Sequence, residues 1–316
     1  MLTPPAIHVP VLRDRIVEIL APALQHAGAV YVDGTLGLAG HARAILQAAP
    51  EARLIGIDRD LDAHELAKEQ LGELASRATL VHAGYDELPE VLDALNVPRI
   101  DAMLLDLGLS SLQIDRLDRG FAYRADAPLD MRMDASTGRT AQDVVNQYSE
   151  RELARILARY GEERFAGRIA RAIVAGRPYD SSAPLVETIG AAIPAAARHT
   201  GGHPAKRTFQ ALRIEVNQEL EGLRAVLPAA LSALKVGGRL AVLSYHSLED
   251  RMVKRAMGEL AVDRAPKGMP VVPAHLTAEI RLLTRGAERP DAEEIEHNTR
   301  AASAKLRAAE RIREEA

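Results

Sequence analysis

Three carboxylates in this sequence each follow a short apolar run. Asp33 ends the run AVYVD, Asp58 ends ARLIGID, and Asp106 ends IDAMLLD. Runs of this length bounded by turn formers are typical of buried parallel strands. Ligands of doubly wound sheets bind outside the carboxyl ends of the strands. We therefore expect these acids, together with Tyr85 after a further run, to meet at one edge of a sheet.

The segment between Asp33 and Asp58 predicts a βαβ unit that binds a nucleoside. Glycine is needed where the backbone turns sharply or approaches a ligand, and the helix expected over 41–48 has unpaired N–H groups at its start. Asp58 lies 21 residues after Gly37, where such folds bind ribose hydroxyls. An ordinary glycine turn in an α/β protein is the alternative.

The glycines have the spacing G-x-x-G-x-x-G, at Gly34, Gly37 and Gly40. Dinucleotide binders have G-x-G-x-x-G instead, so the pattern fits S-adenosylmethionine better than NAD.

Composition restricts the class of protein. The 316 residues are 47% apolar and contain no cysteine, which excludes disulfides, cysteine-ligated zinc and thiol nucleophiles. Neither a signal peptide nor an 18-residue apolar run is found, so we expect a cytoplasmic protein without a membrane partner. The net charge of −4 divides into +3 for residues 115–215 and −7 for the remainder. The segment 195–213 has four basic side chains and no acid. Such a segment forms either a face that binds phosphates or a face that is only solvated.

Apolar runs alternate with helical periodicity, which predicts a doubly wound α/β sheet with right-handed crossovers. The helix after Asp58 is expected over 60–74, with Leu61, Leu66, Leu71 and Leu74 facing inward. A long helix over 204–234 is expected to break near Pro228, and Ser247 is expected to cap the helix after the fifth strand. The strands are expected at 29–33, 52–58, 78–83, 100–111, 237–247, 278–285 and 302–311.

Helical patterns without strands run from about Gln113 to Val216, which predicts a helical domain inserted into the α/β body. We expect residues 1–114 and 216–316 to form one discontinuous cofactor-binding domain and residues 115–215 to form the helical domain. Capping boxes at Thr140 and Ser149 open two of its helices. The stretch DRGFAYRADAPLDMRMD (118–134) has no period and predicts an ordered loop. This loop either contacts substrate or fills the seam between the domains.

These motifs resemble the bacterial 16S ribosomal RNA (cytosine-N4) methyltransferase family, RsmH or MraW. The resemblance covers nearly the whole chain and is most specific at PLDMRMD, RTFQALRI and HSLEDR. It implies a class I, Rossmann-like methyltransferase fold with a helical substrate-recognition domain inserted after the fourth strand. It also implies S-adenosyl-L-methionine as cofactor and N4-methylation of a cytidine in the decoding centre, at the P site, of 16S rRNA in the 30S subunit. The motifs are HVPVL (8–12), DGTLGLAGH (33–41), GIDRD (56–60), LLDLGLSSLQID (104–115), RGFAYRADAPLDMRMD (119–134), YGEERFAGRIARAIV (160–174), HPAKRTFQALRIEVNQEL (203–220), GGRLAVLSYHSLEDRMVK (237–254) and SAKLRAAER (303–311).

Together with the residue pattern, the resemblance implies a set of cofactor-binding residues. Asp58 is expected to bind the ribose, and Gln113 to orient adenine or substrate. Ala39 stands where the family usually has glycine, which adds a methyl group near the methionine moiety at a backbone angle that we expect alanine to tolerate. Tyr85 replaces the usual phenylalanine and keeps the aromatic face. The set is Asp33, Gly37, Ala39, Gly40, His41, Asp58, Tyr85, Asp106 and Gln113.

The implied reaction needs a hydrogen-bond acceptor, because the N4 lone pair of cytosine is delocalised into the ring. Asp106 either contacts the cofactor or accepts a hydrogen bond from N4–H, and Ser110 is a second candidate for catalysis. The usual tetrapeptide of amino-methyltransferases, an acid or amide followed by Pro-Pro-aromatic, is absent.

The target base must leave its stack, so stacking and phosphate-binding groups are expected. His246 is either a structural partner of Glu249 or a substrate contact. The candidates for stacking are Phe121, Tyr123 and Phe209, with core packing as their alternative, and those for phosphate are Arg124, Arg132, Lys206 and Arg207.

Two other classes remain open at this stage. A nicotinamide-dependent oxidoreductase would use the same βαβ unit but with G-x-G-x-x-G. An RNA-binding assembly factor with a vestigial cofactor site would share the basic insertion but show no cofactor-dependent heat stabilisation. No metal site is expected, since His199 and His203 have no carboxylates arranged around them. The sequence leaves open whether the chain forms a homodimer.

Overall fold

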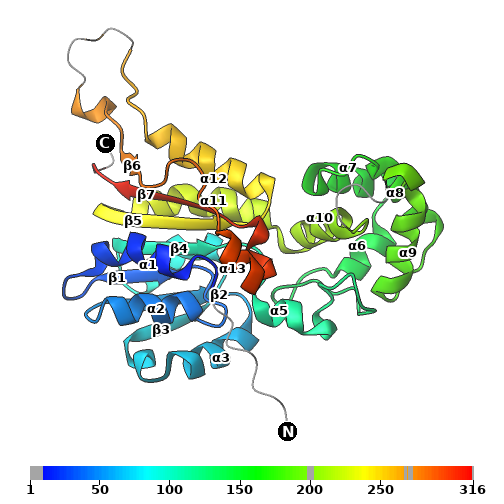
Figure 1. Cartoon of the computed structure of the whole chain (residues 1–316), viewed down its shortest axis with the longest axis horizontal. Coiled ribbons are helices and arrows are strands. Elements are labelled where there is room, and N and C mark those ends of the chain that lie inside the picture. The colour runs from blue at the N-terminus through cyan, green and yellow to red at the C-terminus, as the bar shows by residue number, and fades with distance from the viewer. Residues whose placement is uncertain (1–9, 198–202, 267–268, 270–272, 315–316) are drawn as a thin grey trace. The chain divides into compact units, whose positions relative to one another are not determined.

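A computed structural model of the chain describes residues 10–197, 203–266, 269 and 273–314 (Figure 1). The first residues of the HVPVL motif and, in the basic segment, Arg198 and His199 lie outside the described residues. The chain divides into two compact units, one of Met1–Gly108 with Glu221–Ala316 and one of Leu109–Leu220. We call them the sheet unit and the helical unit. The expected helical domain, 115–215, falls within the second.

A seven-stranded sheet organises the sheet unit, in the order β3-β2-β1-β4-β5-β7-β6 (Figure 1). Neighbours from β3 to β5 pair in parallel, and β7 is antiparallel to both β5 and β6. The predicted doubly wound α/β sheet is therefore confirmed. The strands are β1 (Val30–Asp33), β2 (Arg53–Asp58), β3 (Ala78–His82), β4 (Ile100–Asp106), β5 (Leu234–Ser244), β6 (Ile280–Leu282) and β7 (Lys305–Arg311).

Helices cover both faces of this sheet, and each face has its own apolar core. The central strands β1 and β4 are buried along almost their whole length, as parallel strands between two helical layers must be. One core lies under α1 (Arg13–Leu20), α2 (Gly40–Ala48) and α3 (Leu61–Leu71). The other lies under α4 (Leu88–Ala94), α11 (Glu219–Ala233) and α12 (Ser247–Leu260). A short helix, α13 (Ala292–His297), separates β6 from β7 in the chain.

The inward face expected for α3 is wrong at Leu61 and Leu66 and confirmed at Leu71, while Leu74, which follows the end of the helix, packs against the core. Leu61 and Leu66 are 53% and 39% exposed, whereas Ala63, Ala67 and Leu71 are buried. Leucines spaced by five residues turn by well over a third of a circle at each step of a helix with 3.6 residues per turn, so they cannot share one face. The buried stripe follows a spacing of four residues instead.

The break expected near Pro228 is also wrong. The first helix of this region, α10 (Lys206–Asn217), ends at Gln218, whose left-handed backbone (φ 52°) stops the helical hydrogen bonds. Pro228 lies inside α11, and β5 then begins at Leu234, three residues before its expected start.

The helical unit consists of short helices joined by irregular segments. Capping boxes open two of the helices as predicted, with the hydroxyls of Thr140 and Ser149 accepting hydrogen bonds from the backbone N–H groups of Asp143 and Glu152. The helices before α10 are α5 (Ser111–Asp115), α6 (Ala141–Gln147), α7 (Glu150–Gly161), α8 (Ala166–Ala175) and α9 (Ser182–Ala192). None of the helices in the described ranges has the length and apolar character needed to cross a membrane.

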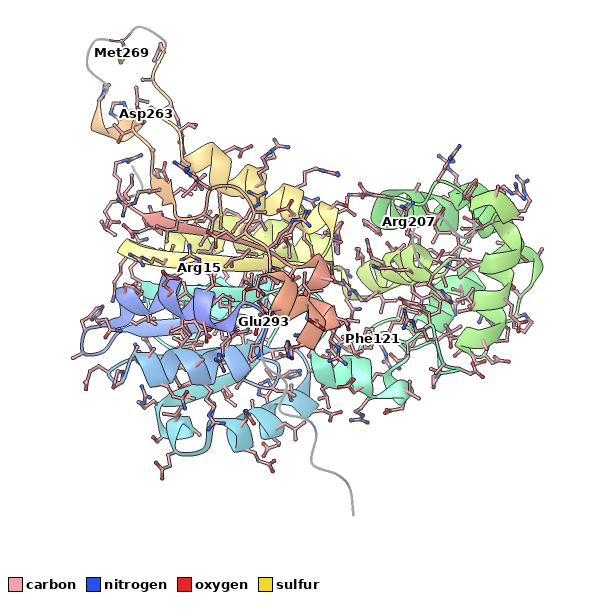
Figure 2. All side chains as sticks on the ribbon, in the orientation of Figure 1. Arg15, Phe121, Arg207, Asp263, Met269 and Glu293 are labelled. Carbon is pink, nitrogen blue, oxygen red and sulfur yellow. The ribbon has the colours of Figure 1, made fainter. Side chains whose placement is uncertain are left out.

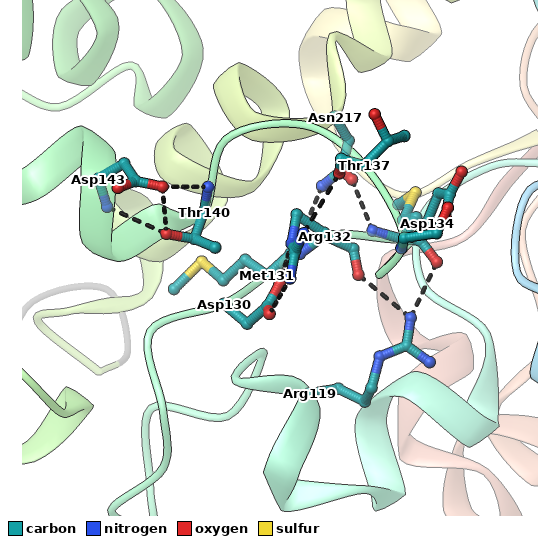
Figure 3. A network of polar contacts seen from close by, with 11 residues as sticks. Arg119, Asp130, Met131, Arg132, Asp134, Thr137, Thr140, Asp143 and Asn217 are labelled. Atoms are coloured by element: carbon teal, nitrogen blue, oxygen red, sulfur yellow. Dashed lines mark hydrogen bonds and ion pairs between the residues drawn. The ribbon is translucent and has the colours of Figure 1, made fainter.

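The loop over 118–134 is ordered by two buried side chains, as Figure 3 shows. Arg119 donates to the carbonyl oxygens of Arg132 and Met133 at 3.1 and 2.8 Å. Asn217, from the end of α10, accepts from the N–H of Met133 and donates to the carbonyl of Met131, both at 2.7 Å. Buried backbone groups need such partners. The prediction of an ordered loop is therefore confirmed.

Candidate functional site

The carboxyl ends of β1, β2 and β4 bring three aspartates to one edge of the sheet. Asp33 is in register with Leu104 of β4 and Gly56 of β2, and Asp58 and Asp106 end their own strands two residues beyond these partners. The chain order reverses between β1 and β4, which makes this edge the topological switch point where such sheets bind ligands.

The loop after β1 approaches this edge through its backbone. Gly37 has φ 49° and donates its N–H to Asp58 Oδ2 at 2.7 Å. A Cβ added to Gly40, the first residue of α2, would lie 2.6 Å from Cγ of Pro10, so no larger residue fits there without a shift. Gly37 is therefore favoured as glycine by its backbone conformation, and Gly40 by the lack of space for a side chain.

Ala39, the residue that caps α2, is in the left-handed region with φ 59° and ψ 24°, and its side chain is fully buried. This conformation costs an alanine about 1–2 kcal/mol. Alanine does adopt the backbone angle here, but the position carries strain that glycine would not have.

Asp58 has the arrangement expected of a ribose-binding carboxylate. Its Oδ2 accepts from Gly37 N–H and its Oδ1 from the N–H of Asp60 at 2.9 Å. A carboxylate has about four lone-pair sites, so each oxygen retains one for a hydroxyl of a ligand. Burial raises the pKa of Asp58, while the two N–H groups oppose that rise.

Asp33 is almost completely buried, at 1% exposure. It accepts a hydrogen bond from the hydroxyl of Tyr31 at 3.1 Å and one from the N–H of Thr35 at 3.2 Å. Burial raises its pKa to about 6, mainly because a charge is poorly solvated there, and neighbouring His41 lowers it in part. Asp33 is therefore mostly ionised at neutral pH and titrates in mild acid.

Asp106 is held on two sides by residues that the sequence analysis did not single out. Tyr245, directly after β5, donates its hydroxyl to Asp106 Oδ1 at 2.9 Å, and Thr35 Oγ1 accepts from the backbone N–H of Asp106 at 2.6 Å. Burial, and next the charge of Asp106, raise the pKa of Tyr245 well above its ordinary value, so the hydroxyl stays protonated as a donor. Tyr245 follows a strand just as Tyr85 does, and that signal could have found it.

His41 lies in the first turn of α2, and its Nε2 is 3.6 Å from Asp106 Oδ2. The side chain is 7% exposed, and within the described residues neither ring nitrogen has a hydrogen-bond partner. Buried polar atoms without a partner are rare and indicate a missing ligand or water. The residues of the sheet unit therefore fit a polar, nucleoside-type cofactor.

Tyr85 opens a short 3-10 turn (Tyr85–Glu87) after β3, at the same sheet edge. The guanidinium of Arg59 lies 5.6 Å from the centre of its ring, and Arg59 also pairs with Asp86 at 3.1 Å. A Cβ on Gly222 would come within 3.1 Å of the ring. The ring is thus fixed between charged and backbone neighbours.

Two predicted residues, Ser110 and Gln113, belong to the helical unit, where they form a capping box that opens α5. Ser110 Oγ accepts from Gln113 N–H at 3.3 Å, and Gln113 Oε1 accepts from Ser110 N–H at 3.1 Å. These contacts give both residues a structural role. Their predicted roles in catalysis and cofactor binding stay predictions.

The predicted phosphate-binding residues divide into exposed and engaged side chains. Arg124, Lys206 and Arg207 are exposed; Figure 2 labels Arg207, which also donates to the carbonyl of Glu162 at 3.2 Å. Arg132 instead forms a two-pronged ion pair with Asp130, with both contacts at 2.8 Å. Burial opposes ionisation of Asp130, but its hydrogen bonds and ion pair with Arg132 together lower its pKa.

The predicted stacking rings are mostly buried in the helical unit. Phe121, labelled in Figure 2, and Phe209 are 8% and 4% exposed. Tyr123 is partly exposed, with its ring 5.8 Å from that of Phe209 and 4.8 Å from that of His203. The structure therefore supports core packing for the two phenylalanines, and Tyr123 is the more accessible ring.

His246 is the N-cap of α12, and its Nδ1 accepts from the N–H of Glu249 at 3.4 Å. Glu249 in turn accepts from the N–H groups of Tyr245 and His246 at 2.8 and 3.2 Å. The expected cap at Ser247 is wrong, because Ser247 is already the first helical residue. The contacts favour the structural reading of His246.

A glycine loop and a ribose-type carboxylate at the switch point of a doubly wound sheet define a Rossmann-like, nucleoside-binding protein. Comparison with known families then narrows this class. The chain matches the model of the MraW methylase family over residues 5–312, and it belongs to that family.

Three similar relatives have the name Ribosomal RNA small subunit methyltransferase H. One from Streptomyces avermitilis is 58% identical over 98% of both chains. One from Thermobifida fusca is 58% identical over 99% of this chain and 96% of its own, and one from Saccharopolyspora erythraea is 60% identical over 97% and 94%. The predicted family, the methyltransferase class and S-adenosyl-L-methionine as cofactor are confirmed.

Proposed function

We propose that this protein transfers a methyl group from S-adenosyl-L-methionine to the exocyclic N4 of a cytidine in the decoding centre of 16S rRNA, within the 30S subunit. Family membership and the names of the relatives support a small-subunit rRNA substrate. The observation that carries the chemistry is the oriented carboxylate of Asp106, held by Tyr245 at 2.9 Å beside a buried histidine.

The sheet unit holds the cofactor. S-adenosylmethionine supplies an electrophilic methyl group on a sulfonium. Asp58 accepts the ribose hydroxyls with the lone pairs that its backbone donors leave available. The backbone of Gly37 and the α2 N-terminus line the methionine side, and Asp33 supplies a negative charge there. Tyr85 offers its ring to the nucleoside.

Asp106 accepts a hydrogen bond from the target N4–H. Tyr245 occupies Oδ1, so Oδ2, 3.6 Å from His41 Nε2, is the oxygen that faces a further donor. Accepting that hydrogen bond returns electron density to N4 and orients it for in-line attack on the methyl carbon. As the bond from N4 to the methyl carbon forms, the sulfonium–methyl bond would break with its electron pair going to sulfur, and Asp106 would accept the proton that N4 loses. A carboxylate fixed by a neighbouring donor needs little reorganisation during the reaction.

The helical unit binds the RNA. Arg124, Lys206 and Arg207 are exposed cations available to phosphates, and Tyr123 is a ring on which a flipped base can stack. Phosphate contacts position the RNA, and base contacts identify the cytidine.

The test uses 30S subunits that lack the modification, S-adenosylmethionine, and nucleoside mass spectrometry for N4-methylcytidine. We expect product with the wild type and at least a hundredfold slower transfer with Asp106→Ala. Asp93→Ala, which removes an exposed carboxylate of the same unit, is the matched control and is expected to keep full activity.

Cofactor affinity, measured by calorimetry on the same variants, separates the two roles of Asp106. Slow transfer with unchanged affinity supports the acceptor role. If saturating cofactor restores the transfer rate of Asp106→Ala to that of the wild type, Asp106 only binds the cofactor. No product from the wild type on 30S subunits or naked 16S rRNA, although cofactor binds, refutes the proposed substrate.

A further inference from the structure

Two rows of exposed arginines lie on neighbouring helices of the helical unit, and the predicted phosphate-binding set includes none of them. On α7 the row has the spacing i, i+4, i+8, and along α8 and the residue before its cap it has the spacing i, i+4, i+7. Residues at these spacings share one side of a helix. The rows are Arg151, Arg155 and Arg159, and Arg164, Arg168 and Arg171, which together we call the arginine face.

The two rows belong to one surface. Each helix buries its opposite side, through Leu153 and Ile156 on α7 and through Ile169 and Ile173 on α8. The helices pack against each other. At one end Arg171 Nε lies 3.3 Å from Glu150 Oε1, which joins the end of the α8 row to the beginning of α7.

Acidic side chains compensate this charge only in part. In the described part of the chain no carboxylate lies within 4.0 Å of the guanidinium nitrogens of Arg151, Arg155, Arg164 or Arg168. Two acids of the same stretch have contacts of their own. Glu152 caps α7 through Ser149, and the hydrogen bonds from Ser149 and, to a smaller extent, the charge of Arg155 lower its pKa. Buried Glu163 accepts from the N–H of Phe165.

Like charges three or four residues apart on a helix repel and destabilise it. The arginine face contains three such pairs within its helices, Arg151 with Arg155 and Arg155 with Arg159 on α7, and Arg168 with Arg171 on α8, so it has a cost in the free protein that an anionic partner would remove. A row of three residues at this spacing is about 12 Å long, enough to contact more than one phosphate of an RNA strand.

Two of the arginines are also partly ordered before any partner binds. The guanidinium of Arg164 lies 5.6 Å from the ring centre of Phe165, and that of Arg159 lies 5.3 Å from the ring centre of Tyr160. Such cation–π contacts restrict a long side chain and reduce the entropy it loses on binding. Guanidinium groups bind phosphate oxygens in pairs of parallel hydrogen bonds.

We propose that the arginine face binds backbone phosphates of the rRNA substrate and supplies much of the salt-dependent affinity for the 30S subunit. This inference rests on the proposed function and adds a second phosphate-binding surface to Arg124, Lys206 and Arg207. The contacts are to the sugar-phosphate backbone and hold the RNA without selecting the base.

The test neutralises the α8 row in the full-length protein, with Arg164→Gln, Arg168→Gln and Arg171→Gln combined. Affinity for 30S subunits lacking the modification is measured at several salt concentrations. We expect at least a tenfold loss of affinity at low salt. The slope of log K against log salt should fall by about 2–3, because each lost phosphate contact removes about 0.7–0.9. Cofactor affinity should not change, and the melting temperature should not fall, because the substitutions remove repulsion between like charges.

Two control proteins make the result specific. The combined Arg→Lys variant of the same three positions keeps the charge and is expected to keep most of the salt slope. The second control neutralises three exposed basic side chains of the sheet unit, with Arg53→Gln, Lys68→Gln and Arg255→Gln combined. This variant is expected to bind 30S subunits as the wild type does.

The proposal is overturned if the glutamine variant binds 30S subunits with wild-type affinity and salt slope, or if the lysine variant loses as much of the salt slope as the glutamine variant does. It is equally overturned if the glutamine variant loses binding only to anionic phospholipid vesicles, which would identify a lipid surface as the partner. Either result leaves the proposed function intact as long as the wild type produces N4-methylcytidine on the same subunits.

Discussion

Tyr245→Phe removes a single hydroxyl from the hydrogen bond that orients Asp106. The bond is 2.9 Å long and joins a neutral donor to a carboxylate. Hydrogen bonds to charged groups contribute about 1.5–3 kcal/mol. Tyr245 is partly exposed, so water can replace some of the lost contact and the lower end of this range applies. A loss of about 1.5 kcal/mol corresponds to roughly tenfold in a rate or a binding constant.

The assay is single-turnover methyl transfer at saturating cofactor, together with calorimetric titration of S-adenosylmethionine. We expect transfer to slow by about tenfold if Asp106 acts on N4, with cofactor affinity nearly unchanged. The matched control is Tyr148→Phe in the helical unit, where the hydroxyl donates to Glu215 Oε1 at 2.7 Å. The control should destabilise the fold by a similar amount and leave cofactor affinity unchanged. If Tyr245→Phe retains both the wild-type transfer rate and the wild-type affinity, the orientation of Asp106 has no part in the reaction.

Three further substitutions test other parts of the structure. Asp33 has its pKa raised from 3.8 to about 6, so its protonation stabilises the fold below pH 4 and that stabilisation is lost as pH rises through 6. As pH rises from 4 to 7, the free energy of unfolding of Asp33→Asn, measured in urea, should therefore increase relative to that of the wild type by up to about 3 kcal/mol. If the difference between the two proteins stays constant over that range, the raised pKa of Asp33 is contradicted. Asp58→Asn replaces one acceptor oxygen by an amide NH2 group, which then faces a backbone N–H and cannot accept a hydrogen bond. Cofactor affinity, measured by calorimetry, should therefore fall by roughly 10- to 100-fold. An unchanged affinity would exclude Asp58 from the ribose site. Asn217→Ala removes the partners of two buried backbone groups in the 118–134 loop and should lower the free energy of unfolding by about 2–4 kcal/mol. An unchanged denaturation midpoint would show that the loop is held by other contacts.

Strands and the glycine loop could be predicted because their signals are local. Short apolar runs mark β1, β2 and β4, and the spacing from Gly37 to Asp58 predicts that both lie at one edge of the sheet, where the structure joins them by a hydrogen bond. The capping boxes of the helical unit, at Thr140 and Ser149, are equally local, since donor and acceptor lie three residues apart.

Contacts between distant segments could not be predicted in this way. The hydroxyl of Tyr245 reaches Asp106 across 139 residues, and this contact depends on β5 pairing beside β4 in one register. The roles of Arg119 and Asn217 in the 118–134 loop likewise depend on how α10 packs. A lone residue such as Phe209 fits either a core or a stacking site, and only its burial separates the two.

Ala39 shows a different limit. The resemblance stated in the sequence analysis marked the position as unusual, but whether alanine is strained there depends on the sign of φ, which the residue type does not reveal. At φ 59° the alanine is strained, and the loop retains its shape because the surrounding core fully buries the side chain.

The most direct test of the central claim is to locate the methyl group on the RNA. 30S subunits lacking the modification are incubated with the protein and S-adenosylmethionine, and fragments of their 16S rRNA are sequenced by mass spectrometry. We predict one added methyl group per subunit, on N4 of a single cytidine in a fragment from the decoding centre. A methyl group on another atom of cytidine, on another base, or outside the decoding centre would contradict the account.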